Sequence, residues 1–188
     1  MFKLEGKISY TVPFDTQHLN NEKYFNWLQD YEVIKSINRL DYVVPVRFAS
    51  VKEYCEKVMN SNADIFFAIY YKKDNEFIGT LRVNSINWYT RSADIGILIG
   101  NKKYWGRGVA TDSIFVVSKY LFDILGLRKL TAGLMDINPA MQKVFEKIGF
   151  QVEGRLRQKD YFEGNYVDHI LMGCFKDEFN INFYQREK

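Results

Sequence analysis

The feature that most constrains the fold is a predicted strand that runs through a glycine-bearing turn into a long apolar helix. The residue types predict a strand over residues 92–99 and a second strand over residues 129–135. Between them, residues 110–125 carry apolar side chains at helical spacing, at Ile114, Val117, Leu121 and Ile124. A helix with one apolar face must bury that face, so this segment predicts a helix packed on a β-sheet.

The rest of the chain also alternates strands with helices. Strands are predicted over residues 7–11, 65–71, 76–87, 150–157 and 166–175, and helices over 21–37, from Ser50 onward and over 139–148. Ser50 and Glu53 form a capping-box pattern at the start of the second of these helices. We therefore expect one α/β domain over residues 1–188, with helices on both faces of a mixed, mostly antiparallel sheet.

Composition and charge exclude several classes of protein. With 188 residues, 47% apolar and 26% charged, the chain has the composition of an ordinary globular domain. Its longest apolar run, residues 65–71, falls far short of the roughly 20 residues that a membrane helix needs, and no signal peptide is predicted. A net charge of +3 does not indicate a nucleic-acid partner. Cys55 and Cys174 have no metal-ligand spacing and are expected to be free thiols, which favours the cytoplasm.

The turn before the long helix is a candidate anion site. Gly106 and Gly108 allow backbone conformations that a side chain would forbid, and the helix start leaves N–H groups unpaired beside the positive end of its dipole. Lys102, Lys103 and Arg107 add positive charge nearby. The alternative is an ordinary glycine-containing loop with solvated basic residues.

Two nucleotide motifs do not fit this turn. No Gly-x-x-x-x-Gly-Lys-Ser/Thr run is present, which excludes a P-loop. A dinucleotide fingerprint needs a third small residue and, about 20 positions on, an acidic one. Thr111 and the basic pair at residues 128–129 occupy those places, so this reading fails as well.

Three motifs in order carry a resemblance to a known family. They are Tyr-Trp-Gly-Arg-Gly-Val-Ala-Thr at 104–111, Asp-Ile-Asn-Pro-Ala at 136–140 leading to Phe-Glu-Lys-Ile-Gly-Phe at 145–150, and Tyr-x-x-Gly-x-Tyr-x-Asp at 161–168. With these motifs the chain resembles the GNAT superfamily of acetyl-CoA-dependent N-acetyltransferases, and within it the RimJ/RimL type. The resemblance covers most of the chain and is strongest over residues 92–173.

The resemblance implies a cofactor site for acetyl-CoA as cosubstrate, without a metal. The sheet would splay open at the strand over 92–99, where the backbone of Ile97, Leu98 and Ile99 would meet the pantetheine arm. The turn would wrap the CoA pyrophosphate with Trp105, Gly106, Arg107, Gly108, Val109, Ala110 and Thr111. Asn138 would contact the amide arm of the cofactor. An equally sound interpretation makes Asn138 the N-cap of the helix that begins at Pro139.

The residues offer no obvious general acid. Phe145 and Met141 stand where members of the family carry a tyrosine or a serine able to protonate the leaving thiolate. A thiolate leaves with a pKa of about 8 to 9, so such an acid is optional. Attack by an amine requires a base, because a typical amine is protonated at neutral pH. Asp160 aligns with the acidic residue proposed for this task, and its alternative is a solvated loop residue near Arg157 and Lys159.

Further residues are candidates for the acceptor side. Asp94 and His169 are further candidate bases, although a lone strand histidine is more often simply packed. Asp168 is expected to organise the last hairpin rather than to react. Trp88, Tyr89 and Tyr161 would line an acceptor cleft or, alternatively, form an aromatic core face.

The sequence therefore predicts an N-acetyltransferase that moves an acetyl group from acetyl-CoA to a primary amine by direct attack in a ternary complex. The acceptor is left open between a protein N-terminus, an amino sugar and another small amine, because variable segments such as residues 39–48 and the Glu163 hairpin would grip it. A catalytically silent acyl-CoA-binding module is the alternative. The expected partners are CoA, the amine and, as an option, a second copy of the chain in a homodimer, with no membrane or nucleic acid.

Overall fold

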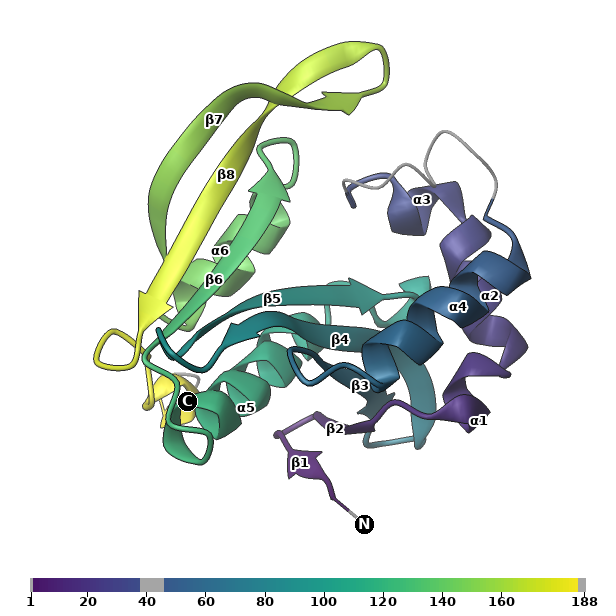
Figure 1. Cartoon of the computed structure of the whole chain (residues 1–188), viewed down its shortest axis with the longest axis horizontal. Helices are drawn as coiled ribbons and strands as arrows, with labels where there is room; N and C mark the ends of the chain where they lie inside the picture. The colour runs from purple at the N-terminus through teal and green to yellow at the C-terminus, as the bar shows by residue number, and fades with distance from the viewer. Residues whose placement is uncertain (1, 38–45, 186–188) are drawn as a thin grey trace.

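The computed structural model describes residues 2–37 and 46–185. Within these ranges one sheet of eight strands runs in the order β1-β2-β3-β4-β5-β6-β8-β7 (Figure 1). The strands are β1 (Leu4–Glu5), β2 (Ser9–Pro13), β3 (Ile65–Tyr71), β4 (Glu76–Asn87), β5 (Ser92–Ile99), β6 (Lys129–Met135), β7 (Gln151–Phe162) and β8 (Asn165–Phe175). The helices are α1 (Thr16–Leu19), α2 (Glu22–Gln29), α3 (Tyr31–Ile34), α4 (Phe48–Met59), α5 (Val109–Asp123) and α6 (Pro139–Lys147), with 3₁₀ turns at Lys102–Tyr104 and Phe183–Gln185.

The sheet opens between its two central strands. Every described strand pair is antiparallel except β5 and β6, which run parallel. These two strands pair only from Ser92 to Asp94, whereas β5 stays paired with β4 as far as Ile99. Beyond Asp94 they diverge, and β6, β7 and β8 lean away from the other strands (Figure 1). The predicted mostly antiparallel sheet and its splay at β5 are both confirmed.

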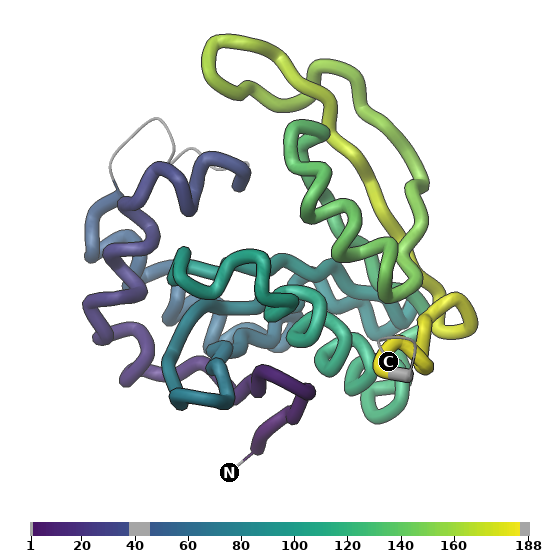
Figure 2. Tube along the Cα trace, turned by 180° about the vertical axis from the view of Figure 1, so that it is seen from behind, coloured from purple at the N-terminus to yellow at the C-terminus, as the bar shows by residue number. Residues whose placement is uncertain are grey.

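Helices cover both faces of the sheet, as predicted. On one face α5 buries its apolar side, including Ile114 and Leu121, against residues of β4 and β5 such as Leu81 and Ile95. On the other face α2 and α4 pack over β3 in a second buried cluster. Seen from behind, the β7–β8 hairpin and the α2–α3 segment stand on opposite sides of the opening in the sheet (Figure 2). No helix in the described ranges has the length and apolar character needed to cross a bilayer.

The first part of the chain differs from the prediction. The single helix expected over residues 21–37 is two helices, because Asp30 has an extended backbone and caps α3 through the amide of Glu32. The predicted capping box at Ser50 is wrong. Helix α4 begins earlier, at Phe48, without a side-chain cap, and Phe48 packs edge-on against Phe25 at 5.4 Å. The observed start lies two residues before the predicted one, which is within the usual uncertainty of a helix end predicted from sequence.

A buried carboxylate ties the start of the chain to α5. Asp112 accepts hydrogen bonds from the backbone amides of Lys7, Ile8 and Ser9 at 2.8–3.2 Å. The hydroxyls of Ser9 and Tyr184 also donate to it, both at 2.6 Å. Asp112 thereby holds the N-terminal and C-terminal segments against the helix whose first turn faces the candidate site.

Candidate active site

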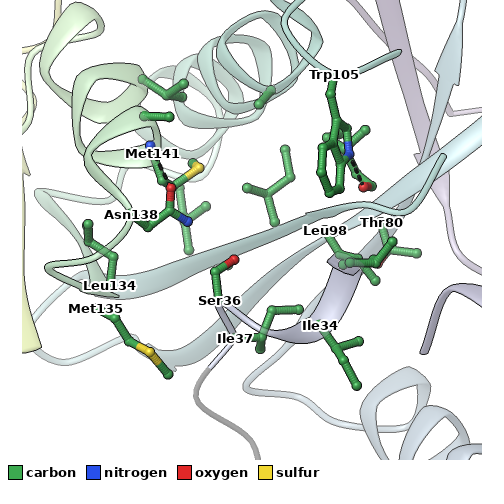
Figure 3. A pocket seen from close by; sticks show the side chains of 18 of the residues that line it. Ile34, Ser36, Ile37, Thr80, Leu98, Trp105, Leu134, Met135, Asn138 and Met141 are labelled. Carbon is green, nitrogen blue, oxygen red and sulfur yellow. Dashed lines mark hydrogen bonds between the residues drawn. The ribbon is translucent and has the colours of Figure 1, made fainter. Parts of the chain in front are cut away.

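A cavity of about 940 Å³ passes through the opening between β5 and β6. Residues of α2, α3 and α4 line it on one side of the sheet, β4 and β5 form its middle, and the start of α5, β6 and α6 line the other side. The close-up shows Trp105 and Asn138 on opposite sides of this space, with Leu98 and Thr80 on the same side as Trp105 (Figure 3). Two binding regions, one on each face of the sheet, are therefore joined through the gap in the sheet.

The N-terminus of α5 is the candidate anion site, and it lies on one side of the cavity. Its N-cap, Gly108, has a left-handed backbone (φ 77°) and makes no side-chain cap. The helices α2 and α6, by contrast, are capped by Asn21 and Asn138. Gly106 also has a left-handed backbone. Because no side chain in the described part of the chain caps α5, its first N–H groups are available to an anionic ligand in the cavity that they line.

The predicted basic residues of this turn do not all face the cavity. Gly106, Gly108, Val109, Ala110 and Thr111 line it. Arg107 is not among the lining residues, and its guanidinium lies over the Tyr104 ring at 5.6 Å from the centroid. Lys102 pairs with Asp30 at 2.6 Å. The candidate anion site is therefore lined by main-chain groups of the turn rather than by these basic side chains.

Strand β5 presents free backbone groups to the gap. The amide of Gly100 donates to Ile78 on β4, so by alternation the N–H and C=O groups of Ile97 and Ile99 point to the open side, and those of Leu98 point to β4. Trp105 occupies one of these groups, since its indole Nε1 donates to the Ile99 carbonyl at 2.7 Å (Figure 3). Of the three residues predicted to offer backbone groups, Ile97 and Ile99 do so and Leu98 contributes its side chain.

Helix α6 closes the same side of the cavity. Asn138 lines the cavity and is also the N-cap, because its Oδ1 accepts the Met141 amide at 3.1 Å with Pro139 in the first turn. The capping interpretation is thus confirmed, and the cap leaves the Asn138 Nδ2 group for a ligand. Phe145 is buried against Phe150, with ring centroids 4.9 Å apart.

Asp160 lies in a strand, not in a solvated loop. It is only 2% exposed, and its carboxylate lies 2.7 Å from the Nδ1 atom of His169 on the neighbouring strand β8. The register of β7 shifts between Leu156 and Asp160, and Gln158 there has a left-handed backbone. This bulge turns one polar residue of an otherwise exposed stretch inward, so the predicted alternative of a surface residue near Arg157 is wrong.

His169 extends from this pair into the cavity. It lines the cavity, and its ring lies directly over Gly133 of β6. A Cβ atom at position 133 would stand 2.4 Å from the His169 Nε2 atom, so only glycine leaves room for the ring. Asp94 lies near His169, and it accepts a hydrogen bond from Thr131 at 3.0 Å. Burial raises the pKa of Asp94, with the Thr131 hydrogen bond opposing the shift.

A polar group on β4 was missed by the sequence prediction. Arg82 lines the cavity on the acceptor side, where its Nε and Nη2 atoms donate to Asp64 at 3.2 and 2.7 Å and its Nη1 atom donates to Tyr54 at 2.7 Å. Asn84 lines the cavity beside it. Because side chains alternate along a strand, Arg82 and Asn84 lie on the same face of β4. The neighbouring sequence does not indicate that this face adjoins a cavity.

The remaining predictions are partly corrected. Trp88 and Tyr89 lie in the β4–β5 turn, 55% and 97% exposed, and Tyr161 is exposed against Tyr166, so none of the three lines the cavity or joins the core. Phe162 lines it instead. Residues 39–45 of the predicted acceptor segment lie outside the described residues.

Asp168 has the expected role in the last hairpin, whereas the expected role of the Glu163 turn in holding the acceptor stays a prediction. Asp168 pairs with Arg155 at 2.8 Å and accepts the Gln158 amide at 2.8 Å, which lowers its pKa and holds the bulge, so its predicted organising role is confirmed. The turn of the same hairpin reaches α3, where the Tyr31 hydroxyl donates to Glu163 at 2.6 Å. The hairpin therefore contacts the opposite wall of the cavity at its tip.

Comparison with known proteins identifies the family. A model of the acetyltransferase (GNAT) domain family matches residues 12–151 of the chain. The chain belongs to the GNAT acetyltransferase family. A probable N-acetyltransferase, YjcK of Bacillus subtilis, is 29% identical over 93% of this chain and 98% of its own. A spermidine N(1)-acetyltransferase of Vibrio cholerae is 31% identical over 64% of this chain and 69% of its own.

A solved structure agrees with the GNAT fold. The crystal structure of spermidine N-acetyltransferase from Vibrio cholerae in complex with CoA and spermine superposes with a TM-score of 0.81 at 24% identity, covering 90% of this chain and 96% of the other. The predicted GNAT fold and acetyltransferase class are confirmed. Members of this family use acetyl-CoA as the acyl donor, so acetyl-CoA is the expected cosubstrate of this GNAT enzyme.

Proposed function

We propose that this GNAT enzyme transfers the acetyl group of acetyl-CoA to a primary amine by direct attack in a ternary complex, as its RimJ/RimL-like motifs suggest. The observation that carries the proposal is the continuous cavity that joins an uncapped helix N-terminus on one side of the sheet to an imidazole on the other. A thioester held in the gap between β5 and β6 is then accessible to an amine from the opposite face.

The cofactor side follows from the main chain. The pyrophosphate of CoA would accept hydrogen bonds from the first amides of α5, where no side chain competes. The pantetheine arm would run along the free edge of β5, with Asn138 opposite. An N–H group of Ile97 or Ile99 would donate to the thioester oxygen, stabilising the negative charge that develops there during attack.

The acceptor side supplies the base. We assign proton removal to His169 and give Asp160 the task of positioning it, because the Asp160 carboxylate is buried and directed at the His169 Nδ1 atom. This bond leaves the Nε2 lone pair for the amine proton. The amine nitrogen forms a bond to the acetyl carbon, the carbon–sulfur bond breaks, and the amine proton moves to His169. CoA leaves as the thiolate, which takes its proton from solvent.

The silent acyl-CoA-binding module is the second candidate. It is favoured by Phe145 and Met141, which place no proton donor on α6 where the thiolate would leave. Both candidates bind CoA, but only the enzyme releases free CoA thiol when an amine is present.

The decisive experiment measures CoA release over a panel of amines that includes peptides, amino sugars and polyamines. CoA affinity is measured separately by titration calorimetry, in the wild type and in Gly108→Val, with Gly154→Ala as a glycine control whose added Cβ makes only ordinary contact at 3.6 Å. We expect thiol release with at least one amine and a CoA affinity at least about tenfold weaker in Gly108→Val. Unchanged affinity in a folded Gly108→Val protein contradicts the cofactor site, and CoA binding without release for any amine selects the silent module.

A further inference from the structure

On the acceptor side of the cavity, the space above the centre of the sheet is empty, and polar side chains stand beside it. Arg82 on β4 stands opposite Gly96 on β5 in the register of the sheet. A Cβ atom at position 96 would meet no heavy atom within 4 Å, so the space above Gly96 is empty. Gly133 and the His169 ring lie on the far side of the same gap. A guanidinium and an imidazole therefore stand on opposite sides of this space.

Arg82 is held in place and still has donors to offer. Asp64 and Tyr54 accept three of its five N–H groups and fix the plane of the guanidinium. Among the described residues, no partner takes the other two N–H groups. A guanidinium held in this way is suited to a carboxylate or phosphate, which accepts paired hydrogen bonds from it.

The charges that line the cavity do not suit a polyamine. Glu32 is the single carboxylate residue among the described lining residues, and it is already paired with Lys35 at 2.7 Å. Lys35, Arg82 and Lys147 contribute positive charge to the same lining. A polyamine carries several ammonium groups, and each one buried without a carboxylate partner costs free energy.

The spacing across the sheet sets the shape of the acceptor. Arg82, Gly96 and Gly133 belong to three successive strands, about 4.8 Å apart where strands are paired and farther apart across the gap. Asp94, on the strand between them, lies near both His169 and Arg82. An acceptor with its nitrogen at His169 therefore has its other end over Gly96, toward the free edge of Arg82.

We propose that the acceptor of this enzyme is a primary amine that carries an anionic oxygen group, a carboxylate or a phosphate, bound by Arg82 across Gly96. This inference rests on the proposed function and narrows it to one class of amine. It separates this enzyme from the spermidine acetyltransferases among its relatives, whose named acceptor is a polycation.

The test compares matched acceptors that differ in the anionic group alone. Leucine is paired with leucinamide, glucosamine 6-phosphate with glucosamine, and spermidine is the polycation. The leucine pair tests for a bound carboxylate, and the glucosamine pair tests for a bound phosphate. We expect kcat/KM to be about ten- to a hundredfold higher for the anionic member of one pair, and this ratio to fall to about one in Arg82→Gln.

Two further variants control for charge and folding. Arg82→Gln combined with Asp64→Asn removes both charges, so that no buried carboxylate is left unpaired, and should lose the preference equally. Lys52→Gln removes one positive charge from the exposed face of α4 and should keep the preference. CoA affinity should be unchanged in every variant, because Arg82 lies across the sheet from the α5 turn.

The outcomes separate the two proposals. Equal kcat/KM within both pairs, a preference that survives Arg82→Gln, or spermidine as the best acceptor overturns the inference and leaves the acetyltransferase proposal standing. Release of CoA with none of these or any other amine, while CoA still binds, overturns the proposed transfer and the acceptor class together.

Discussion

Replacing Asp160 with asparagine should slow acetyl transfer by about 10²- to 10⁴-fold while leaving acetyl-CoA affinity unchanged. The carboxylate is 2% exposed and lies 2.7 Å from the His169 Nδ1 atom, so its negative charge acts on the imidazole at short range and with little solvent screening. Asparagine keeps the size and one acceptor oxygen but loses that charge, and the imidazolium formed during proton transfer loses its counter-charge.

The structure also predicts how this variant combines with others. If Asp160 acts through His169, then Asp160→Asn should add little to the loss already caused by His169→Gln, because the two residues form one unit. Gly133→Ala should cause a similar loss from the other side, since its Cβ would displace the His169 ring. The stability of Asp160→Asn should fall by no more than about 1 to 3 kcal/mol.

The assay is a pH–rate profile from about pH 6 to 9 with saturating acceptor, together with calorimetric titration of acetyl-CoA. The wild-type rate should rise with pH, and Asp160→Asn should recover part of its deficit at high pH, where free amine is abundant. Glu153→Gln is the matched control, because it removes a carboxylate from the same hairpin outside the cavity, where Glu153 pairs with Lys129. Turnover of Asp160→Asn within about threefold of wild type at every pH, or losses that multiply in the double variant, would refute the reasoning.

Three further predictions concern stability and reactivity. Asp94→Asn should raise the free energy of unfolding near neutral pH, because burial raises the pKa of Asp94. The gain should vanish as the pH falls and the Asp94 carboxyl of the native wild type becomes protonated. Urea titrations at several pH values would show this dependence. Asp112→Ala should destabilise the protein by about 3 to 5 kcal/mol in the same assay, since three backbone amides lose their acceptor, and a loss under about 1 kcal/mol would contradict this account. Cys55 and Cys174 should not react with a thiol reagent at about pH 8 until the protein unfolds, because both are buried and burial raises the pKa of Cys174 to about 12; rapid native labelling would show that this region opens.

The sequence by itself determined the features that depend on neighbouring residues. The strand at Ser92–Ile99, the left-handed glycines at 106 and 108, and the start of α5 are set by backbone preferences that act within a few positions. Asn138 followed by proline is a helix start for the same reason. These elements line one side of the cavity, so the backbone of the proposed cofactor side could be predicted from the sequence, and its role in binding CoA stays a prediction.

Tertiary structure alone decided the acceptor side. Asp160 contacts His169 because a bulge in β7 changes which residues of the strand face inward. The alternation of polar and apolar residues in the sequence does not predict where a bulge occurs. Arg82 lines the cavity because β4 pairs with β5, and β5 is not paired with β6 beyond Asp94. A local sequence pattern specifies which face of a strand a side chain occupies. Only the packing of distant strands specifies what lies next to that face, and the proposed acceptor chemistry depends on that packing.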